Sequence, residues 1–298
     1  DLHIFGLQKL GAKIVMHDDC VEATAPAGGL RGGVVDFDFP SVTATENIIM
    51  AAVLAKGVTT INGAAREPEV VDLVNFLNKV GADIQGAGSN KIIIKGVEKL
   101  NSDQGYSIMG DRVEVGTFLI AATMTGGDIE ITGIDPQVLE SPLQHLRLAG
   151  AEISCGVDSI KLNMLDKKLR AVSITTAPYP GFPTDLQAQW LALNIVAIGE
   201  SKVKEQVFEN RLKHVTAMNA MGAELFMQDR VVISQGNKRL KSAEVFATDL
   251  RASAGLVLAG LVADGVTKIN DIYHIDRGYE HIESKFNSLG CNVFRVDG

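Results

Sequence analysis

The residues of this chain that could do chemistry are charged side chains placed beside turns, where segments with a helical pattern begin. Asp185 closes the stretch 175–185, TTAPYPGFPTD, which holds three of the eight prolines. Proline fixes φ and removes a backbone donor, so Pro178, Pro180 and Pro183 predict a stiff, extended approach to the next helix. Such an approach delivers one carboxylate to a helix start, either as a catalytic group or as a helix cap with a favourable dipole contact.

Other charged groups lie at matching places along the chain. Asp249 and Arg251 begin a second helical segment, and three more groups lie between a strand and a helix: Arg66 with Glu67, Glu209 with Arg211, and Asp276 with Arg277. Equivalent positions of a repeat face the same way, so these groups are expected to converge, and helix N-termini there favour anions. The alternative for Arg66 and Arg211 is pairing with Glu67 and Glu209 on a solvated face.

The elements that must hold these residues repeat along the sequence. A helical segment ending in Leu-Gly-Ala or a variant, followed by a strand, recurs five times about 70 residues apart, with glycines at 11, 81, 150, 222 and 290. A helix of small residues, leading through a glycine into a β-branched strand, recurs with the same period at Gly57, Gly127, Gly199 and Gly265. One unit therefore reads β-α-β-α-β-β, which predicts an α/β (α+β) fold.

The phase of this repeat predicts the domain organisation. Residues 1–30 hold only the second half of a unit, so an N-terminal part of the protein is expected to be missing from this chain. The predicted strand Tyr106–Met109 ends near Gly110, where a new unit begins. We therefore expect residues 1–110 to be the remainder of a first domain, about one and a half units, and residues 111–298 to be a second domain of three units.

Composition narrows the class of function. The net charge of −8 argues against a nucleic-acid-binding face. Three distant cysteines fit a reducing compartment, and the longest apolar run, Ala252–Ala263, is too short to cross a bilayer. The sequence contains no glycine-rich turn typical of dinucleotide binding, no phosphate-binding loop and no pair of histidines at the spacing of a zinc site. We expect a cytoplasmic protein without metal, cofactor, membrane or nucleic-acid partner.

Six segments resemble the bacterial enolpyruvyl transferases that act on UDP-N-acetylglucosamine (UDP-N-acetylglucosamine 1-carboxyvinyltransferases), within the EPSP synthase superfamily. They span the whole chain: residues 41–47 (SVTATEN), 64–69 (AAREPE), 176–189 (TAPYPGFPTDLQAQ), 207–211 (VFENR), 247–253 (ATDLRAS) and 273–279 (YHIDRGY). The resemblance implies inside-out α/β barrel-type domains built from six β-α-β-α-β-β units, which agrees with the repeat.

The resemblance also implies a reaction and its residues. The enolpyruvyl group of phosphoenolpyruvate would move to the 3-hydroxyl of UDP-N-acetylglucosamine, releasing phosphate, in the first committed step of peptidoglycan synthesis. Asp185 would contact that hydroxyl and take its proton, with Asp249 near the reacting carbon and Arg251 and Arg277 on phosphoenolpyruvate. The remaining substrate contacts implied are Val207 on the UDP-sugar, Ser41 and Val42 near the uridine and diphosphate, and Asp1 and Leu2 beside the uracil.

The sequence departs from the family in places. The mobile loop with the proton-donor Cys lies before the residue matching Asp1, so this chain is expected to be inactive alone and to need its missing N-terminal segment. Thr43 stands where many relatives have Gly and Phe39 where some have Lys, which leaves the loop contacts open. Two alternatives remain: the sister shikimate-pathway enzyme, 3-phosphoshikimate 1-carboxyvinyltransferase, and a non-catalytic UDP-sugar-binding relative.

Overall fold

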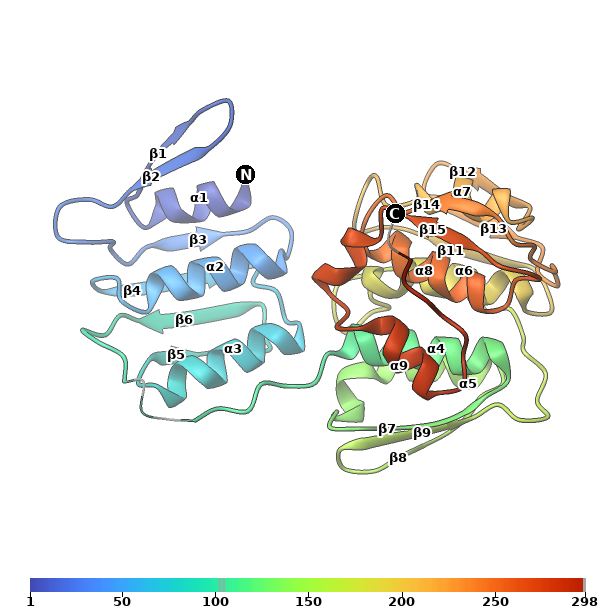
Figure 1. Cartoon of the computed structure of the whole chain (residues 1–298). Coiled ribbons are helices and arrows are strands. Elements are labelled where there is room, and N and C mark those ends of the chain that lie inside the picture. Colours follow the sequence, from blue (N-terminus) through green and yellow to red (C-terminus); the bar gives the residue numbers. More distant parts are fainter. Residues whose placement is uncertain (102, 104, 297–298) are drawn as a thin grey trace. The chain divides into compact units, whose positions relative to one another are not determined.

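The computed structural model of the chain describes residues 1–101, 103 and 105–296 (Figure 1). The chain divides into two compact units, Asp1–Met109 and Gly110–Gly298. Within the described residues, no helix combines the length and the apolar character needed to cross a membrane.

The first unit contains a half repeat followed by a complete one. The half repeat is α1 (Leu2–Lys9) with the hairpin β1 (Lys13–Met16) and β2 (Val21–Thr24). The complete repeat is β3 (Val34–Asp36), α2 (Val42–Ala52), β4 (Val58–Asn62), α3 (Pro68–Lys79), β5 (Asp83–Gln85) and β6 (Lys91–Lys95). Its sheet has the order β3-β4-β6-β5, in which β3 and β4 are parallel and the other neighbours antiparallel. Alternate residues of β4 and β6 are buried, which places one face of the sheet in the core.

The second unit contains three successive repeats. The first is α4 (Arg112–Thr125), β7 (Asp128–Thr132), η1 (Pro136–Leu139), α5 (Glu140–Leu148), β8 (Glu152–Cys155) and β9 (Ser159–Asn163). The next is β10 (Ile174–Thr175), η2 (Thr184–Leu186), α6 (Gln187–Val196), β11 (Ser201–Lys204), α7 (His214–Ala220), β12 (Leu225–Gln228) and β13 (Val231–Ser234). The last is β14 (Glu244–Phe246), α8 (Leu250–Leu261), β15 (Lys268–Asn270), η3 (Ile272–Arg277) and α9 (Ile282–Ser288).

These elements confirm the predicted α/β repeat. The five repeated glycines, at 11, 81, 150, 222 and 290, all have φ between 89° and 111°. A residue with such a positive φ commonly ends an α-helix, and glycine adopts it without steric cost. The sheets of the second unit have the orders β7-β9-β8, β10-β11-β13-β12 and β14-β15. The strands of the described residues thus form separate open sheets, and no closed barrel is found among them.

The prediction of a strand at Tyr106–Met109 is wrong. These residues are irregular, and Tyr106 is held by α3 instead. Its hydroxyl donates to the Asp72 carboxylate at 2.8 Å, and its ring packs edge-on against Phe76 with centroids 5.4 Å apart. The segment is therefore fixed by side-chain contacts to a helix rather than by pairing with a strand.

The core of the second unit is built around α4, α6 and α8. Every residue from Gln187 to Ile195 is buried, as expected for a helix that is apolar nearly all round. Helices α6 and α8 lie side by side (Figure 1). A Cβ on Gly255 of α8 would lie 2.9–3.0 Å from the Cβ and backbone of Ala188 on α6. Only glycine permits this approach, which brings the starts of the two helices together.

Candidate active site

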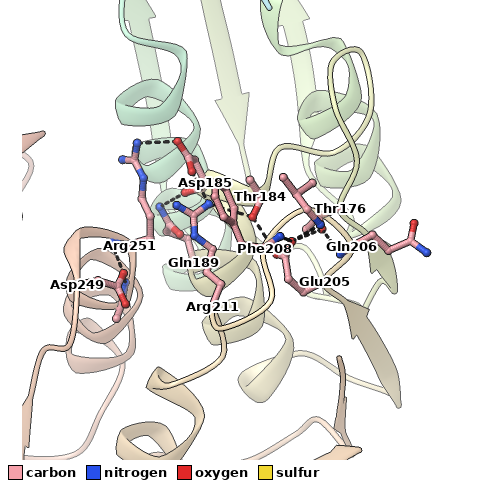
Figure 2. Close-up of polar contacts among 12 residues, drawn as sticks. Thr176, Thr184, Asp185, Gln189, Glu205, Gln206, Phe208, Arg211, Asp249 and Arg251 are labelled. Carbon is pink, nitrogen blue, oxygen red and sulfur yellow. Dashed lines mark hydrogen bonds and ion pairs between the residues drawn. The ribbon is translucent and has the colours of Figure 1, made fainter. Parts of the chain in front are cut away.

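A carboxylate held between two arginines lies at the start of α6 and α8 (Figure 2). Arg211 Nη1 donates to Asp185 Oδ1 at 2.5 Å, and Arg251 Nη2 donates to Asp185 Oδ2 at 2.7 Å. The exposed fractions of the three side chains are 32% for Asp185, 21% for Arg211 and 18% for Arg251, so the cluster is shielded yet still reachable from solvent. Charge-assisted hydrogen bonds of this kind are strong.

The two arginines decide the charge of Asp185. Burial alone would raise the pKa of its carboxyl, but the charges of Arg251 and Arg211 and their hydrogen bonds outweigh burial, and the pKa lies below its usual range. The pKa of Arg251 is raised, because the nearby carboxylate of Asp185 outweighs the burial that would lower it. The cluster therefore holds one anion and two cations, a net positive site that suits a polyanionic ligand.

Helix geometry sets the position of Arg251. Asp249 is the N-cap of α8, and its Oδ1 accepts from the backbone N–H of Arg251 and of Ala252, both at 2.9 Å. Burial would raise the pKa of Asp249, but these N–H groups and the Thr248 hydroxyl lower it. Asp249 is thus a charged N-cap that holds Arg251 in the first turn of α8.

Arg211 does not make the local pair that its sequence neighbours suggest. Glu209 pairs with Arg230 at 2.9 Å, whereas Arg211 reaches Asp185. The guanidinium of Arg211 also lies over the ring of Phe208, 4.3 Å from its centroid. The solvated-face alternative for Arg211 is therefore wrong, because a partner distant in sequence offers a better shielded carboxylate.

The backbone of Asp185 is held by a buried polar network. Gln189 Nε2 donates to the Asp185 carbonyl at 3.0 Å and to Thr117 Oγ1 at 3.1 Å. The hydroxyls of Thr117 and Tyr279 are 2.8 Å apart. Residues of α4, α6 and the segment after η3 thus fix the turn that carries Asp185.

A buried histidine lies behind the arginines. His214, at the start of α7, is 2% exposed, and its Nε2 has no hydrogen-bond partner within the described residues. Burial, opposed by the charge of Asp249 and aided by the charge of Arg211, lowers the pKa of His214 to about 4. His214 is therefore neutral at neutral pH.

Acid should destabilise the protein through this histidine. The pKa of His214 is about 4 in the folded chain against an ordinary 6.5, so the unfolded chain binds its proton first. The stabilisation is complete above about pH 6.5 and is lost as pH falls toward 4, amounting to about 3 kcal/mol. His214→Gln should remove this part of the pH dependence in urea unfolding between pH 7 and pH 4. Parallel curves for variant and wild type would contradict the prediction.

Two further predicted residues of the second unit are Arg277 and Val207. Arg277 is exposed at the end of η3, and in the part of the chain that the structure describes no ion pair joins it to Asp185. Val207 is half-buried after β11, and its N–H donates to Glu205 at 2.7 Å. The predicted substrate roles of Arg277 and Val207 remain predictions.

The predicted contacts in the first unit lie at two neighbouring helix starts. Asp1 is the N-cap of α1, followed by Leu2, and Ser41 is the N-cap of α2, followed by Val42. His3 connects the two helices, with Nε2 at 3.3 Å from Thr43 Oγ1 and Nδ1 at 3.0 Å from Asn47 Nδ2. The Thr43 side chain therefore helps to connect α2 to α1 through its contact with His3. Phe39 is 43% exposed just before α2.

No set of three or more His, Cys, Asp or Glu side chains that could hold a metal ion is found among residues 1–101, 103 and 105–296. The chemistry of the site is that of a carboxylate and two guanidinium groups. Such a site can bind phosphate and carboxylate groups and can accept a proton from a hydroxyl.

Residues 1–286 match the family described as EPSP synthase (3-phosphoshikimate 1-carboxyvinyltransferase). The chain belongs to the EPSP synthase family. Among solved structures, this family member is similar to the enolpyruvyl transferase NikO from Streptomyces tendae, with 26% sequence identity and a TM-score of 0.89 over 98% of this chain and 71% of NikO.

The fold is also shared with EPSP synthase from Acinetobacter baumannii. One structure has 19% identity and a TM-score of 0.71, covering 96% of this chain and 69% of that one. A second has 17% identity and the same TM-score, covering 100% and 71%. In this EPSP synthase family member, sequence reasoning left the role of Arg211 open and did not consider Glu205 or His214. The VFENR segment signalled Arg211, whereas nothing local marks the other two.

Proposed function

We propose that this enolpyruvyl transferase family member uses UDP-N-acetylglucosamine as its acceptor and phosphoenolpyruvate as its donor. The observation that carries the proposal is the Asp185 carboxylate held between Arg211 and Arg251, in segments that resemble transferases acting on this sugar nucleotide. The proposed reaction belongs to the first committed step of peptidoglycan synthesis, in the cytoplasm.

The chemistry of the transfer matches this cluster. A bond forms between the acceptor hydroxyl oxygen and the carbon of phosphoenolpyruvate that carries the phosphate, while the hydroxyl proton passes to Asp185 and the neighbouring methylene carbon takes up a proton from a general acid. Loss of a proton from the resulting methyl group then restores the double bond and expels phosphate. Both substrates are anions, so fork-shaped arginines suit them. Asp249 keeps Arg251 at the helix start, and Arg277 and the helix starts at Ser41–Val42 and Asp1–Leu2 supply further proposed substrate contacts.

Substrate binding would also change the strength of the base. Arg211 and Arg251 lower the pKa of Asp185 in the free protein. A phosphate or carboxylate that accepts hydrogen bonds from these arginines would share their charge and weaken their effect on Asp185. The pKa of Asp185 would then rise, making it a better proton acceptor once both substrates are bound.

The second candidate is a 3-phosphoshikimate 1-carboxyvinyltransferase, favoured by the family description that matches residues 1–286. Arg251 and Arg277 would again bind phosphoenolpyruvate, and the acceptor would be shikimate 3-phosphate. The two candidates differ only in the acceptor, so one assay separates them.

The test is phosphate release from phosphoenolpyruvate by the full gene product with each acceptor. Release with UDP-N-acetylglucosamine supports the proposal, and release only with shikimate 3-phosphate supports the second candidate. Tight UDP-sugar binding without turnover would instead indicate a non-catalytic relative.

A further inference from the structure

Glu205, directly after β11, has a fully buried carboxylate that lies near Thr176 and Thr184 (Figure 2). Glu205 Oε1 accepts hydrogen bonds from Thr176 Oγ1 at 2.8 Å, Val207 N at 2.7 Å and Phe208 N at 3.0 Å. Its Oε2 accepts from Thr184 Oγ1 at 2.9 Å. All four partners donate, which is the pattern of an ionised carboxylate, an acceptor-only group. Burying such a group is costly unless it is hydrogen-bonded in this way.

Thr184 connects this carboxylate to the arginine pair. Its hydroxyl has one hydrogen, which it donates to Glu205, so its lone pairs are available to Arg211. Arg211 Nη1 donates to Thr184 Oγ1 at 2.9 Å and to Asp185 Oδ1 at 2.5 Å. The hydroxyl therefore does not cap α6, although a threonine before a helix predicts a cap. Because Glu205 fixes the direction of the Thr184 hydroxyl, it also fixes the position at which that oxygen accepts the hydrogen bond from Arg211.

Glu205 also influences Arg211 through the hydrogen bonds that it accepts from two backbone N–H groups. They hold the N–H groups of Val207 and Phe208, and thereby the turn that carries the Phe208 ring. That ring lies 4.3 Å from the Arg211 guanidinium, a favourable cation–π contact. One buried carboxylate thus fixes two groups that contact the Arg211 side chain besides Asp185, namely the Thr184 hydroxyl and the Phe208 ring.

We propose that Glu205 is a positioning residue that orients Arg211 against Asp185 and ties this pair to the backbone at Val207. The inference rests on the proposed function, in which Asp185 takes the acceptor proton and Val207 contacts the acceptor. Glu205 lies beneath these residues and acts only through Thr184, Arg211 and the 207–208 backbone.

Two threonines that donate to Glu205 provide a matched test. Thr184→Val breaks the connection to Arg211. Thr176→Val removes another donor to the same carboxylate and an acceptor for the Gln206 N–H, but among the described residues Thr176 has no hydrogen bond to Arg211. Thr184→Val and Glu205→Gln should each lower kcat roughly 10- to 100-fold. In both variants the acid limb of the kcat profile should move to higher pH, because Arg211 is one of the groups that lower the pKa of Asp185. Thr176→Val should lower the thermal unfolding midpoint and leave the acid limb in place.

Rescue separates positioning from stability. Thr184→Ser keeps the hydroxyl and should restore the wild-type acid limb, even if Thr184→Val or Glu205→Gln folds poorly. A Thr184→Ser enzyme with the acid limb of Thr184→Val would overturn the proposal. So would equal shifts in Thr184→Val and Thr176→Val, or a folded Glu205→Gln enzyme with wild-type kcat and pH profile.

Hydrogen exchange keeps this test independent of the proposed function. If the wild-type gene product releases no phosphate with either acceptor, the proposed function fails and exchange decides the role of Glu205. Faster exchange across 205–211 in Glu205→Gln, together with faster exchange across 184–189 in Thr184→Val but not in Thr176→Val, would support the positioning role. Unchanged exchange in these segments would overturn it.

Discussion

Asp185→Asn should lower kcat roughly 10²–10⁴-fold, the range typical of removing a general base. The asparagine side chain keeps the size of the carboxylate but cannot take a proton from the acceptor hydroxyl. Its NH2 group, a donor, replaces one of the two oxygens that now accept hydrogen bonds from Arg211 and Arg251. Steady-state phosphate release at saturating phosphoenolpyruvate and acceptor measures the effect.

The matched control for this variant is Asp264→Asn. Asp264 is also paired with an arginine, Arg239, but both side chains are more than half exposed on the surface. Exposed pairs of this kind contribute little to stability, so the control should retain wild-type kcat. A kcat for Asp185→Asn within a few-fold of wild type would rule out Asp185 as the base.

Arg251→Gln should lower kcat/KM for phosphoenolpyruvate roughly 10²–10³-fold, because truncating one member of a shielded, hydrogen-bonded charge pair is costly. The variant should also move the acid limb of the kcat/KM profile to higher pH. The charge of Arg251 helps to lower the pKa of Asp185, so its removal raises that pKa, and the base is protonated at a higher pH than in wild type.

Arg251→Lys tests whether the planar fork matters. Lysine keeps the positive charge but loses the paired N–H geometry, so it should recover the acid limb more fully than kcat/KM. Arg239→Gln, at the exposed pair with Asp264, should change neither quantity. An unmoved acid limb in Arg251→Gln would show that its charge does not control Asp185.

The sequence predicts the repeat well because its signals are local. The glycines that end each helix, such as Gly81 and Gly222, need a left-handed conformation, and their spacing reports the length of the unit. Tyr106–Met109 failed as a strand for a different reason. Its apolar pattern is compatible with a strand, but the Tyr106 hydroxyl and ring find partners on α3, and sequence patterning does not reveal such long-range side-chain contacts.

In the candidate site, too, the sequence predicts what depends on local pattern and does not predict contacts between distant residues. Asp185 and Arg251 could be singled out from their places before apolar helices. The partner of Arg211 could not be deduced, because Glu209 lies two residues away and the actual partner, Asp185, lies 26 residues away. Glu205 was overlooked because a glutamate after a short strand is usually solvated, and only the folded chain brings four donors to it.

The close contact of α6 and α8 at Gly255 has a consequence for the charges that the two helix starts can carry together. Asp185 precedes Gly199 by the same 14 residues that separate Arg251 from Gly265, so the two side chains occupy one register in successive copies of a single module. A carboxylate at both positions would bring like charges together where the helix starts converge and would oppose their docking. The difference in charge between the two copies therefore has two effects: it lets the helix starts pack together, and it supplies the ion pair of Asp185 and Arg251 that forms the site.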